Sequence, residues 1–502
     1  MANTTTTTTT PRKQGGGGHI LMFPFPAQGH ILPLLDFVHQ LAIRATSTTT
    51  ITILVTPKNL PILNPLLIQY PSIVQTLVLP FPTHPGSLIP PGVENVKNLP
   101  PLYFIPMIKT MSKLYNPILD WFRSHSSPPT CIISDFFLGW TQNLASQLGI
   151  RRIVFCPSGA LTLSIFSSLW RDLPTPAYDG NNSGEDHTNA LVSFPKVPGC
   201  PTYPWWQLSP LYRDYVNGGS SNSGDLELVR REFLANVESW GMVFNSFQEL
   251  EGIYLDHMKQ AYFGNKRVWA VGPLSKPGPN ERSGTSTDET CTDIFAWLDT
   301  CDDHSVVYIC FGSQTVLKNT QMEALAVGLE KSGVKFVWCV KEPTVGHVSG
   351  EYGLVPSWFE ERTAGRGLVV RGWAPQVLIL KHRAVGSFLT HCGWNSVLES
   401  IAAGVPMLAW PMGADQYVNA ILLVDGLKVG VRVYEGEETI PNADELARCV
   451  AESVAVSSTG KNEMKLKAME LKQAATDAVS CNENGGGGSS FTDLDDLVHH
   501  IF

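Results

Sequence analysis

Short runs of β-branched and aromatic residues alternate with longer stretches of helical periodicity along almost the whole chain. Strands that are separated by helix-length segments pair in parallel, because a parallel connection needs a crossover that is usually a helix. The pattern therefore predicts an α/β protein whose parallel sheets are covered by helices on both faces. Strands are predicted at 19–25, 50–56, 130–134, 151–156 and 242–247 in the first half, and at 305–311, 335–340, 367–373, 385–390, 406–410 and 429–433 in the second.

The 502 residues are enough for two or three domains that each bury a core of their own. Residues 274–290 are rich in Pro, Gly, Ser and Thr, and this composition predicts a linker between a first domain, 19–273, and a second, 291–485. Residues 1–18 are polar and of low complexity, so a disordered tail is expected there.

The last segment, 486–502, has the pattern of an amphipathic helix. Ser490 and Asp493 match the S/T-x-x-D/E pattern of a helix start, which predicts a capping box. Apolar residues then recur on one face of the predicted helix, at Leu494, Leu497, Val498 and Ile501. Such a face needs an apolar partner elsewhere in the chain.

The composition excludes several kinds of partner. With a formal net charge of −9, the chain offers no basic surface for nucleic acid. Its best membrane candidate, 19–43, is interrupted by prolines, histidines and an aspartate, so no integral membrane contact is expected. Residues 1–18 lack the apolar core of a signal peptide, and the ten cysteines include no C-x-x-C pair. We therefore expect a cytoplasmic protein with reduced thiols. A monomer is also expected.

The segment FLTHCGWNSVLESIAAG predicts a strand, a His-Cys-Gly turn, and a helix that begins near Trp394. Ligands of open parallel sheets bind where strands end and helices begin, because backbone N–H groups and the helix dipole are available there. His391, Asn395 and Ser396 lie at this point and can hold phosphate oxygens with their side chains. Glu399 follows Asn395 by about one helical turn.

The larger block from Trp373 to Gln416 resembles the nucleotide-sugar signature of plant family 1 UDP-glycosyltransferases. The resemblance covers nearly the whole chain after Gly18 and is closest to the subgroup that glycosylates flavonoids, benzoates and other small phenols. It implies a GT-B fold, in which two Rossmann-like domains face each other and the last helix crosses back to the first domain. The fixed points that carry it are Trp373, His391, Trp394, Asn395, Ser396, Glu399, Asp415 and Gln416.

The resemblance also implies roles for individual residues in binding a UDP-sugar. Trp373 stacks on uracil, Ala374 and Gln376 complete the nucleoside site, and Glu399 binds the ribose hydroxyls. Ser313 lies against the diphosphate and Ser158 touches the sugar, although Pro157 stands where relatives often have a bulkier residue. Asp415 and Gln416 bind the sugar hydroxyls, and Gln at this position most often accompanies glucose. The other donor-binding positions are His391, Trp394, Asn395 and Ser396.

A catalytic pair is predicted at the ends of early strands. His30 follows the first strand and Asp135 follows strand 130–134, and parallel strands bring such ends together. A neutral His can take the proton of an attacking hydroxyl while a carboxylate fixes its tautomer. In the resembled family matching residues form this dyad, so His30 is assigned as the base and Asp135 as its partner.

We expect the transfer to invert the anomeric configuration and to need neither a metal nor a cofactor. The D-x-D sequence from Asp493 to Asp495 lies in the predicted terminal helix and follows no suitable strand. The helix end at 391–396 can stabilise the leaving phosphate without a cation. Direct attack opposite UDP would convert an α-linked donor into a β-glycoside.

The small phenolic acceptor is expected between the two domains, whereas the role of two tryptophans and the identity of the donor sugar stay open. Trp205 and Trp206 fit a pocket or an ordinary core equally well. UDP-rhamnose or UDP-xylose could replace UDP-glucose as donor. A UDP-sugar-binding protein without catalysis would lack the dyad, and a dinucleotide oxidoreductase would need a G-x-G-x-x-G after the first strand, which is missing. The expected acceptor-binding residues are Gln28, Phe136, Phe137, Trp205, Trp206 and Gly413.

Overall fold

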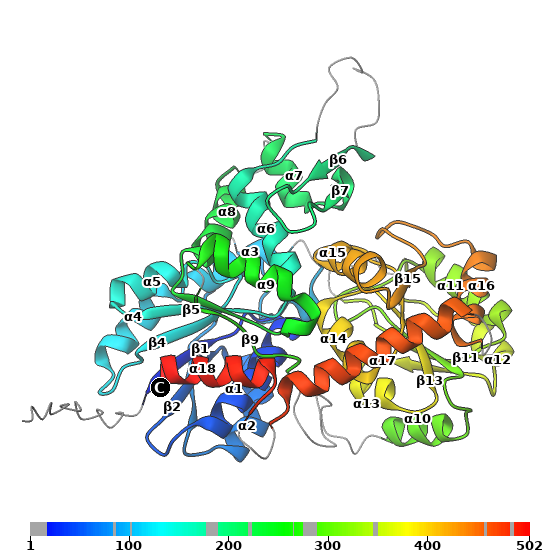
Figure 1. Ribbon diagram of the computed structural model, residues 1–502, viewed down its shortest axis with the longest axis horizontal. Coiled ribbons are helices and arrows are strands. Elements are labelled where there is room, and N and C mark those ends of the chain that lie inside the picture. The colour runs from blue at the N-terminus through cyan, green and yellow to red at the C-terminus, as the bar shows by residue number, and fades with distance from the viewer. Residues whose placement is uncertain are drawn as a thin grey trace, which may run out of the picture.

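Two parallel sheets, one from each half of the chain, form two lobes that lie side by side (Figure 1). The expected tail over 1–17 and most of the expected linker, 275–288, lie outside the residues that the structure describes. The structure is a computed structural model and describes residues 18–83, 87–100, 103–176, 189–218, 223–264, 266–274, 289–344, 350–455, 459–481 and 486–502.

The first lobe is built on a seven-stranded sheet whose strands are all parallel. Its strands are β1 (His19–Phe23), β2 (Thr50–Val55), β3 (Val74–Val78), β4 (Cys131–Asp135), β5 (Arg151–Cys156), β8 (Gly241–Phe244) and β9 (Val268–Ala270), in the order β3-β2-β1-β4-β5-β8-β9. A separate antiparallel pair consists of β6 (Leu191–Ser193) and β7 (Thr202–Pro204). Because β1 pairs with β4, the loops that follow these two strands leave the sheet at the same edge.

Helices cover both faces of this sheet, as the alternation of β1 requires. Ile20 and Met22 belong to the core under one set of helices, whereas Leu21 and Phe23 belong to the core on the other face. The helices of this lobe are α1 (Gln28–Arg44), α2 (Asn64–Gln69), α3 (Phe104–Ser112), α4 (Tyr115–Ser124), α5 (Thr141–Leu148), α6 (Ala160–Asp172), α7 (Pro210–Val216), α8 (Ser223–Val237) and α9 (Gln248–Tyr262), with 3₁₀ turns η1 (Pro57–Leu63), η2 (Val96–Asn98) and η5 (Trp205–Gln207).

The second lobe repeats this design with a six-stranded parallel sheet. Val307 and Ile309 of its central strand enter one core, and Val306 and Tyr308 enter the other. The strands are β10 (Val306–Cys310), β11 (Lys335–Val340), β12 (Gly367–Arg371), β13 (Val385–Thr390), β14 (Met407–Ala409) and β15 (Gly430–Arg432), in the order β12-β11-β10-β13-β14-β15.

The helices of the second half include two that reach the first lobe. The first, α17, contacts α14 of its own lobe and α9 of the other, and the second, α18, lies across the first lobe (Figure 1). No helix in the described part of the chain is long and apolar enough to cross a membrane. The helices are α10 (Glu289–Asp299), α11 (Asn319–Ser332), α12 (Phe359–Arg362), α13 (Gln376–Lys381), α14 (Trp394–Ala403), α15 (Gln416–Ile421), a π-helical turn η6 (Leu422–Gly426), α16 (Ala443–Val454), α17 (Thr459–Val479) and α18 (Ser489–Ile501).

The apolar face of α18 docks on the core of the first sheet. Leu494, Leu497 and Ile501 are buried in the same cluster as Ile20 and Met22, so the partner that the sequence required is the first lobe. The predicted capping box is wrong. No side chain caps the helix start; instead the Asp493 carboxylate accepts the backbone N–H of Ala270 at 2.7 Å, and the Ser490 hydroxyl donates to the Gly272 carbonyl at 2.5 Å.

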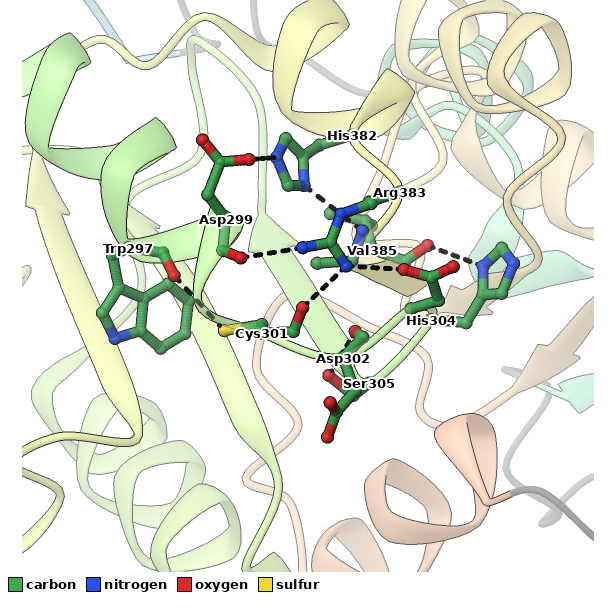
Figure 2. Close-up of polar contacts among 11 residues, drawn as sticks. Trp297, Asp299, Cys301, Asp302, His304, Ser305, His382, Arg383 and Val385 are labelled. Carbon is green, nitrogen blue, oxygen red and sulfur yellow. Dashed lines mark hydrogen bonds and ion pairs between the residues drawn. The ribbon is translucent and has the colours of Figure 1, made fainter.

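A polar cluster around Arg383 lies at the end of the second sheet where the strands begin (Figure 2). The Arg383 guanidinium donates to the backbone carbonyls of Cys301, at 2.9 Å, and Asp299, at 2.7 Å, and to the Asp303 carboxylate at 2.5 Å. Next to it, His382 Nε2 lies 3.2 Å from Asp299 Oδ1. These contacts join the segment before β10 to the turn before β13. Their role is therefore structural.

The predicted strands all exist; those at 151–156, 335–340 and 385–390 match in full, and the ends of the others differ from the predictions by at most three residues. Two strands of the first sheet were not predicted. β3 has a mixed burial pattern with exposed residues at two of its five positions, and β9 is only three residues long. Neither gives a strong apolar run, so the pattern missed both.

Candidate active site

A cavity of about 850 Å³ lies between the carboxyl ends of the two sheets. Loops that follow β1, β4 and β5 supply its wall on the first lobe, and loops that follow β10 to β14 supply the other wall. The predicted site residues that line it are Gln28, His30, Phe136, Phe137, Ser158, Ser313, Trp373, Ala374, Gln376, His391, Trp394, Asn395, Ser396, Glu399, Asp415 and Gln416.

His30 and Asp135 are in direct contact. His30 Nδ1 lies 2.8 Å from Asp135 Oδ2, with the His30 side chain 15% exposed and the carboxylate fully buried. The other carboxylate oxygen, Oδ1, accepts the backbone N–H of Phe137 at 2.9 Å, which fixes the orientation of Asp135. The bond to Asp135 leaves Nε2 as the ring nitrogen that can take a proton from a molecule in the cavity.

A buried arginine stands behind this pair. Arg152 is 1% exposed, and its guanidinium donates to Ser134 Oγ at 2.9 Å, to the Asp135 carbonyl at 3.4 Å and to the Leu138 carbonyl at 3.2 Å. Burial lowers the pKa of Arg152 to about 10, so the group keeps its charge at neutral pH. Arg152 therefore holds the end of β4 and places a positive charge near the carboxylate.

Aromatic rings surround His30. Phe136 and Phe137 stack against its imidazole at centroid distances of 5.6 and 5.0 Å, and Phe25 meets it edge-on at 5.6 Å. Phe104 stacks on Phe25 at 5.7 Å and also lines the cavity. This part of the cavity suits a flat apolar molecule, held with a polar edge toward His30.

On the opposite wall, the amino end of α14 points into the cavity. Gly393 is the N-cap residue and Cys392 before it has φ 65°, a left-handed conformation that turns the chain sharply from β13 into the helix. Gly312 approaches the same turn so closely that a Cβ on it would stand 2.5 Å from His391 Nε2. Desolvation lowers the pKa of His391 to about 4, so its imidazole is neutral at pH 7.

Three polar atoms on the cavity walls have no partner within the described part of the chain. They are Gln28 Oε1, His391 Nδ1 and Asn395 Oδ1. Buried polar atoms are nearly always hydrogen-bonded, so these atoms indicate a site made for a polar ligand. Gln28 belongs to the wall of the first lobe, whereas His391 and Asn395 belong to the second.

The side chains expected at the nucleoside form a connected group. Gln376 Nε2 donates to Glu399 Oε2 at 2.8 Å and to Ser396 Oγ at 3.0 Å, which orients the carboxylate toward the cavity that all three residues line. Trp373 lies at the mouth of the same region and is 53% exposed. An indole exposed to this extent has a free face on which a planar base can stack.

Asp415 and Gln416 present two different polar groups. Asp415 Oδ2 accepts Ser158 Oγ at 3.2 Å and Asn419 Nδ2 at 3.0 Å, and burial raises the pKa of this carboxyl. Gln416 Oε1 accepts the backbone N–H groups of Met412 and Gly413 at 2.9 and 3.1 Å. The carboxylate can accept further hydrogen bonds from a ligand, and the NH₂ group of Gln416 can donate them.

Two hydrogen bonds across the cavity hold the two lobes together. Asn395 Nδ2 donates to the Gly29 carbonyl at 3.0 Å, next to His30, and Trp394 Nε1 donates to the Asn245 carbonyl at 2.7 Å. The Trp394 indole is thereby buried and its N–H is committed to the first lobe. These bonds place the amino end of α14 directly beside the start of α1.

Four predicted site residues do not line the cavity. Asp135 lies behind His30, where the predicted pairing of the two residues places it. Trp205 is 8% exposed and packs in the core against Tyr212, and Trp206 packs edge-on against Tyr417. The Gly413 N–H donates to Gln416 Oε1, so this residue contacts a cavity-lining side chain without lining the cavity itself.

The sequence interpretation missed three polar residues that shape the site. Lys341 lines the cavity, and its ammonium donates to the Lys97 carbonyl at 2.9 Å and to the Ser313 carbonyl, so it bridges the lobes. Its position directly after β11 was a usable signal. Asn419, four residues after Asp415 on α15, accepts the Thr162 hydroxyl at 3.1 Å. Arg152 was detectable as a charge inside an apolar strand.

The chain matches known proteins over most of its length. Residues 283–474 match the model of the family described as UDP-glucoronosyl and UDP-glucosyl transferase. UDP-glycosyltransferase 89B2 of Stevia rebaudiana is 53% identical over 96% of this chain and 97% of its own length. Flavonol 3-O-glucosyltransferase UGT89B1 of Arabidopsis thaliana is 51% identical over 96% of both chains.

Solved structures show the same architecture. The crystal structure of Arabidopsis thaliana UGT89C1 with UDP-L-rhamnose is 36% identical, covers 97% of this chain and 99% of its own, and superposes with a TM-score of 0.75. A second structure of that protein holds quercetin and superposes with a TM-score of 0.74. Two facing Rossmann-like lobes of the GT-B type are therefore confirmed. From its sequence, its fold and these relatives, the chain belongs to plant family 1 of the UDP-glycosyltransferases.

Proposed function

We propose that this enzyme transfers glucose from UDP-glucose to a hydroxyl of a small phenol, with inversion and without a metal or a cofactor. The observation that carries the proposal is His30, which holds Asp135 on one ring nitrogen and faces the cavity with the other. A UDP-sugar-binding protein without catalysis has no use for such a pair. All the proposed groups come from one chain, so a monomer suffices.

The proposed reaction is a single displacement. His30 Nε2 accepts the phenolic proton as the oxygen attacks the anomeric carbon, and the Asp135 carboxylate stabilises the imidazolium that forms. Attack from the face opposite UDP converts the α-linked donor into a β-glycoside. The departing diphosphate gains negative charge, which the backbone N–H groups at the start of α14 stabilise together with Ser313, Asn395 and Ser396.

Two observations support glucose as the donor sugar. Asp415 and Gln416 offer an acceptor and a donor side by side, which suits neighbouring hydroxyls of one sugar. In addition, the relative that is 51% identical is called a glucosyltransferase. Trp373, Ala374, Gln376 and Glu399 are proposed to hold the uridine.

A second donor is favoured by a specific similarity. A flavonol 7-O-rhamnosyltransferase of Arabidopsis thaliana is 38% identical to this chain, and the structure of UGT89C1 contains UDP-L-rhamnose. UDP-rhamnose is therefore the first alternative donor, and UDP-xylose is the second. The chemistry at His30 would be the same for all three.

The acceptor is proposed to bind in the aromatic part of the cavity. Phe104, Phe136 and Phe137 line the cavity and can enclose a flat ring system, with a hydroxyl directed at His30. Two similar proteins are described with flavonols as substrate or ligand, which fits a ring of this size. Gln28, through its unpartnered Oε1, is placed to accept a second hydroxyl.

A matrix of donors and acceptors tests the proposal. The purified enzyme is incubated with UDP-glucose, UDP-rhamnose or UDP-xylose and with flavonols, benzoates and simple phenols, and products are identified by mass spectrometry. We expect hexosides from UDP-glucose at the highest kcat/KM, with β configuration by NMR. An α-glucoside would overturn inversion, and absence of any glycoside would overturn the acceptor class.

A further inference from the structure

Two cysteines face each other across neighbouring strands at the floor of the cavity. Cys310 is the last residue of β10 and Cys339 is the last but one of β11, and the two are direct partners in the parallel register. Partners in adjacent parallel strands lie about 4.8 Å apart and project to the same face. This separation is within the range that a disulfide spans.

Both cysteines line the cavity. Cys339 is partly exposed, whereas Cys310 is 9% exposed. When Cys310 is ionised, its thiolate can accept the single hydrogen of the Cys339 thiol, which lowers the pKa of Cys310 although burial opposes the effect. The same bond and burial raise the pKa of Cys339 well above its usual range.

The pair lies beneath the residues that are proposed to hold the uridine. Cys339 Sγ donates to the Gly372 carbonyl at 3.3 Å, immediately before Trp373. Two residues before Cys310 on the same strand, the Tyr308 hydroxyl donates to Gln376 Oε1 at 3.4 Å. Cys339 and Tyr308 therefore contact the loop 372–376 at its two ends.

We propose that Cys310 and Cys339 are a dithiol that a hydroperoxide oxidises to a disulfide, and that this modification weakens nucleotide binding. The Cys310 thiolate attacks one peroxide oxygen, forming an S–O bond while the O–O bond breaks and water or an alcohol leaves. Cys339 sulfur then attacks Cys310, the S–S bond forms, and the S–O bond breaks with release of water. Two sulfurs lose two electrons in total, and the peroxide gains them.

The disulfide acts on the uridine site through lost contacts. It removes the thiol hydrogen that Cys339 donates to Gly372, and it draws the ends of β10 and β11 to a fixed separation. The Gly372 carbonyl then loses its partner and the loop that carries Trp373 and Gln376 shifts. A nucleotide already bound would cover the thiols and slow their oxidation. This inference rests on the proposed uridine site.

Oxidation of the reduced full-length enzyme by hydrogen peroxide tests the proposal. Peptide mapping should find the Cys310–Cys339 link with a mass loss of about 2 Da, and UDP pre-binding should slow its formation. Calorimetry with UDP should give a Kd at least about tenfold weaker after oxidation, restored by dithiothreitol. Absence of the link, or a link with unchanged Kd, would overturn the proposal.

Variants separate this pair from other thiols. In Cys339→Ser and in Cys339→Ala, the ratio of UDP Kd values after and before peroxide should be close to one, whatever the starting affinity. Cys200→Ser changes an exposed cysteine and should keep the full loss. If the reduced enzyme does not bind UDP, the proposed uridine site is wrong. Peptide mapping would still show in that case whether the Cys310–Cys339 disulfide forms.

Discussion

His30 and Asp135 are 105 positions apart in the chain, yet His30 Nδ1 stands 2.8 Å from Asp135 Oδ2 at the edge where β1 and β4 end. The carboxylate is fully buried, and the imidazole opens to the cavity. The first lobe thus supplies the two residues to which the proposed proton transfer is assigned. The nucleotide groups, in contrast, come from the second lobe, so catalysis and donor binding can be tested separately.

Asp135→Asn should reduce kcat on the order of 10²-fold or more, because an amide can stabilise the wrong tautomer of His30 and cannot balance an imidazolium. The UDP Kd should stay unchanged. Steady-state kinetics and calorimetry check both values, with Asp495→Asn on the surface of α18 as the matched control. Turnover near that of the wild type would remove Asp135 from the mechanism.

Gln416→Ala should lower kcat/KM for UDP-glucose by about ten- to a hundredfold, because the loss of a buried hydrogen bond costs about 1–3 kcal/mol. The Kd of UDP should change much less, since the groups proposed to hold the nucleoside are Trp373, Gln376 and Glu399. Competition assays with UDP and with UDP-glucose measure the two effects. Equal losses for both ligands would show that Gln416 does not act on the sugar.

Transfer activity should survive an excess of EDTA, because the amino end of α14 and Ser313 are proposed to take the place of a cation at the diphosphate. Initial rates with and without chelator provide the measurement. The contrary result is complete loss of activity that Mn²⁺ or Mg²⁺ specifically restores.

Leu497→Ala should destabilise the protein by about 2–5 kcal/mol, because this fully buried side chain joins α18 to the core of the first sheet. His499→Ala, on the exposed side of the same helix, is the control and should have little effect. Denaturant unfolding followed by circular dichroism compares the two. An unchanged midpoint for Leu497→Ala would show that α18 contributes no docking energy.

Much of the fold was predictable because its strands are buried runs with clear ends. The predicted strands of the second sheet match β11 and β13 residue for residue, since both are apolar runs bounded by polar turns. β3 was not predicted because exposed and buried positions are mixed along it. β9 was not predicted because three residues are too few to show a periodic pattern. The start of α18 was misassigned because Asp493 satisfies a backbone group of β9, a partner that local sequence does not reveal.

The site was predictable where it lies in one continuous segment and less so where it depends on contacts between lobes. The helix start at Trp394 follows directly from the strand-turn-helix pattern. The bond from Asn395 to Gly29 joins residues 366 positions apart, and no sequence pattern carries it. Aromatic residues of a core and of a pocket look alike in sequence, so Phe104 was missed while Trp205, a core residue, was proposed.

The most direct test of the account is His30→Ala, measured for transfer and for UDP binding on the same preparation. The account predicts that kcat/KM for glucosylation of a phenol falls by about 10²-fold or more, while the Kd of UDP stays within about twofold of the wild type. His499→Ala on the exposed side of α18 serves as the control. Undiminished transfer, or a loss of UDP affinity as large as the loss of activity, would contradict the assignment of His30 as the base.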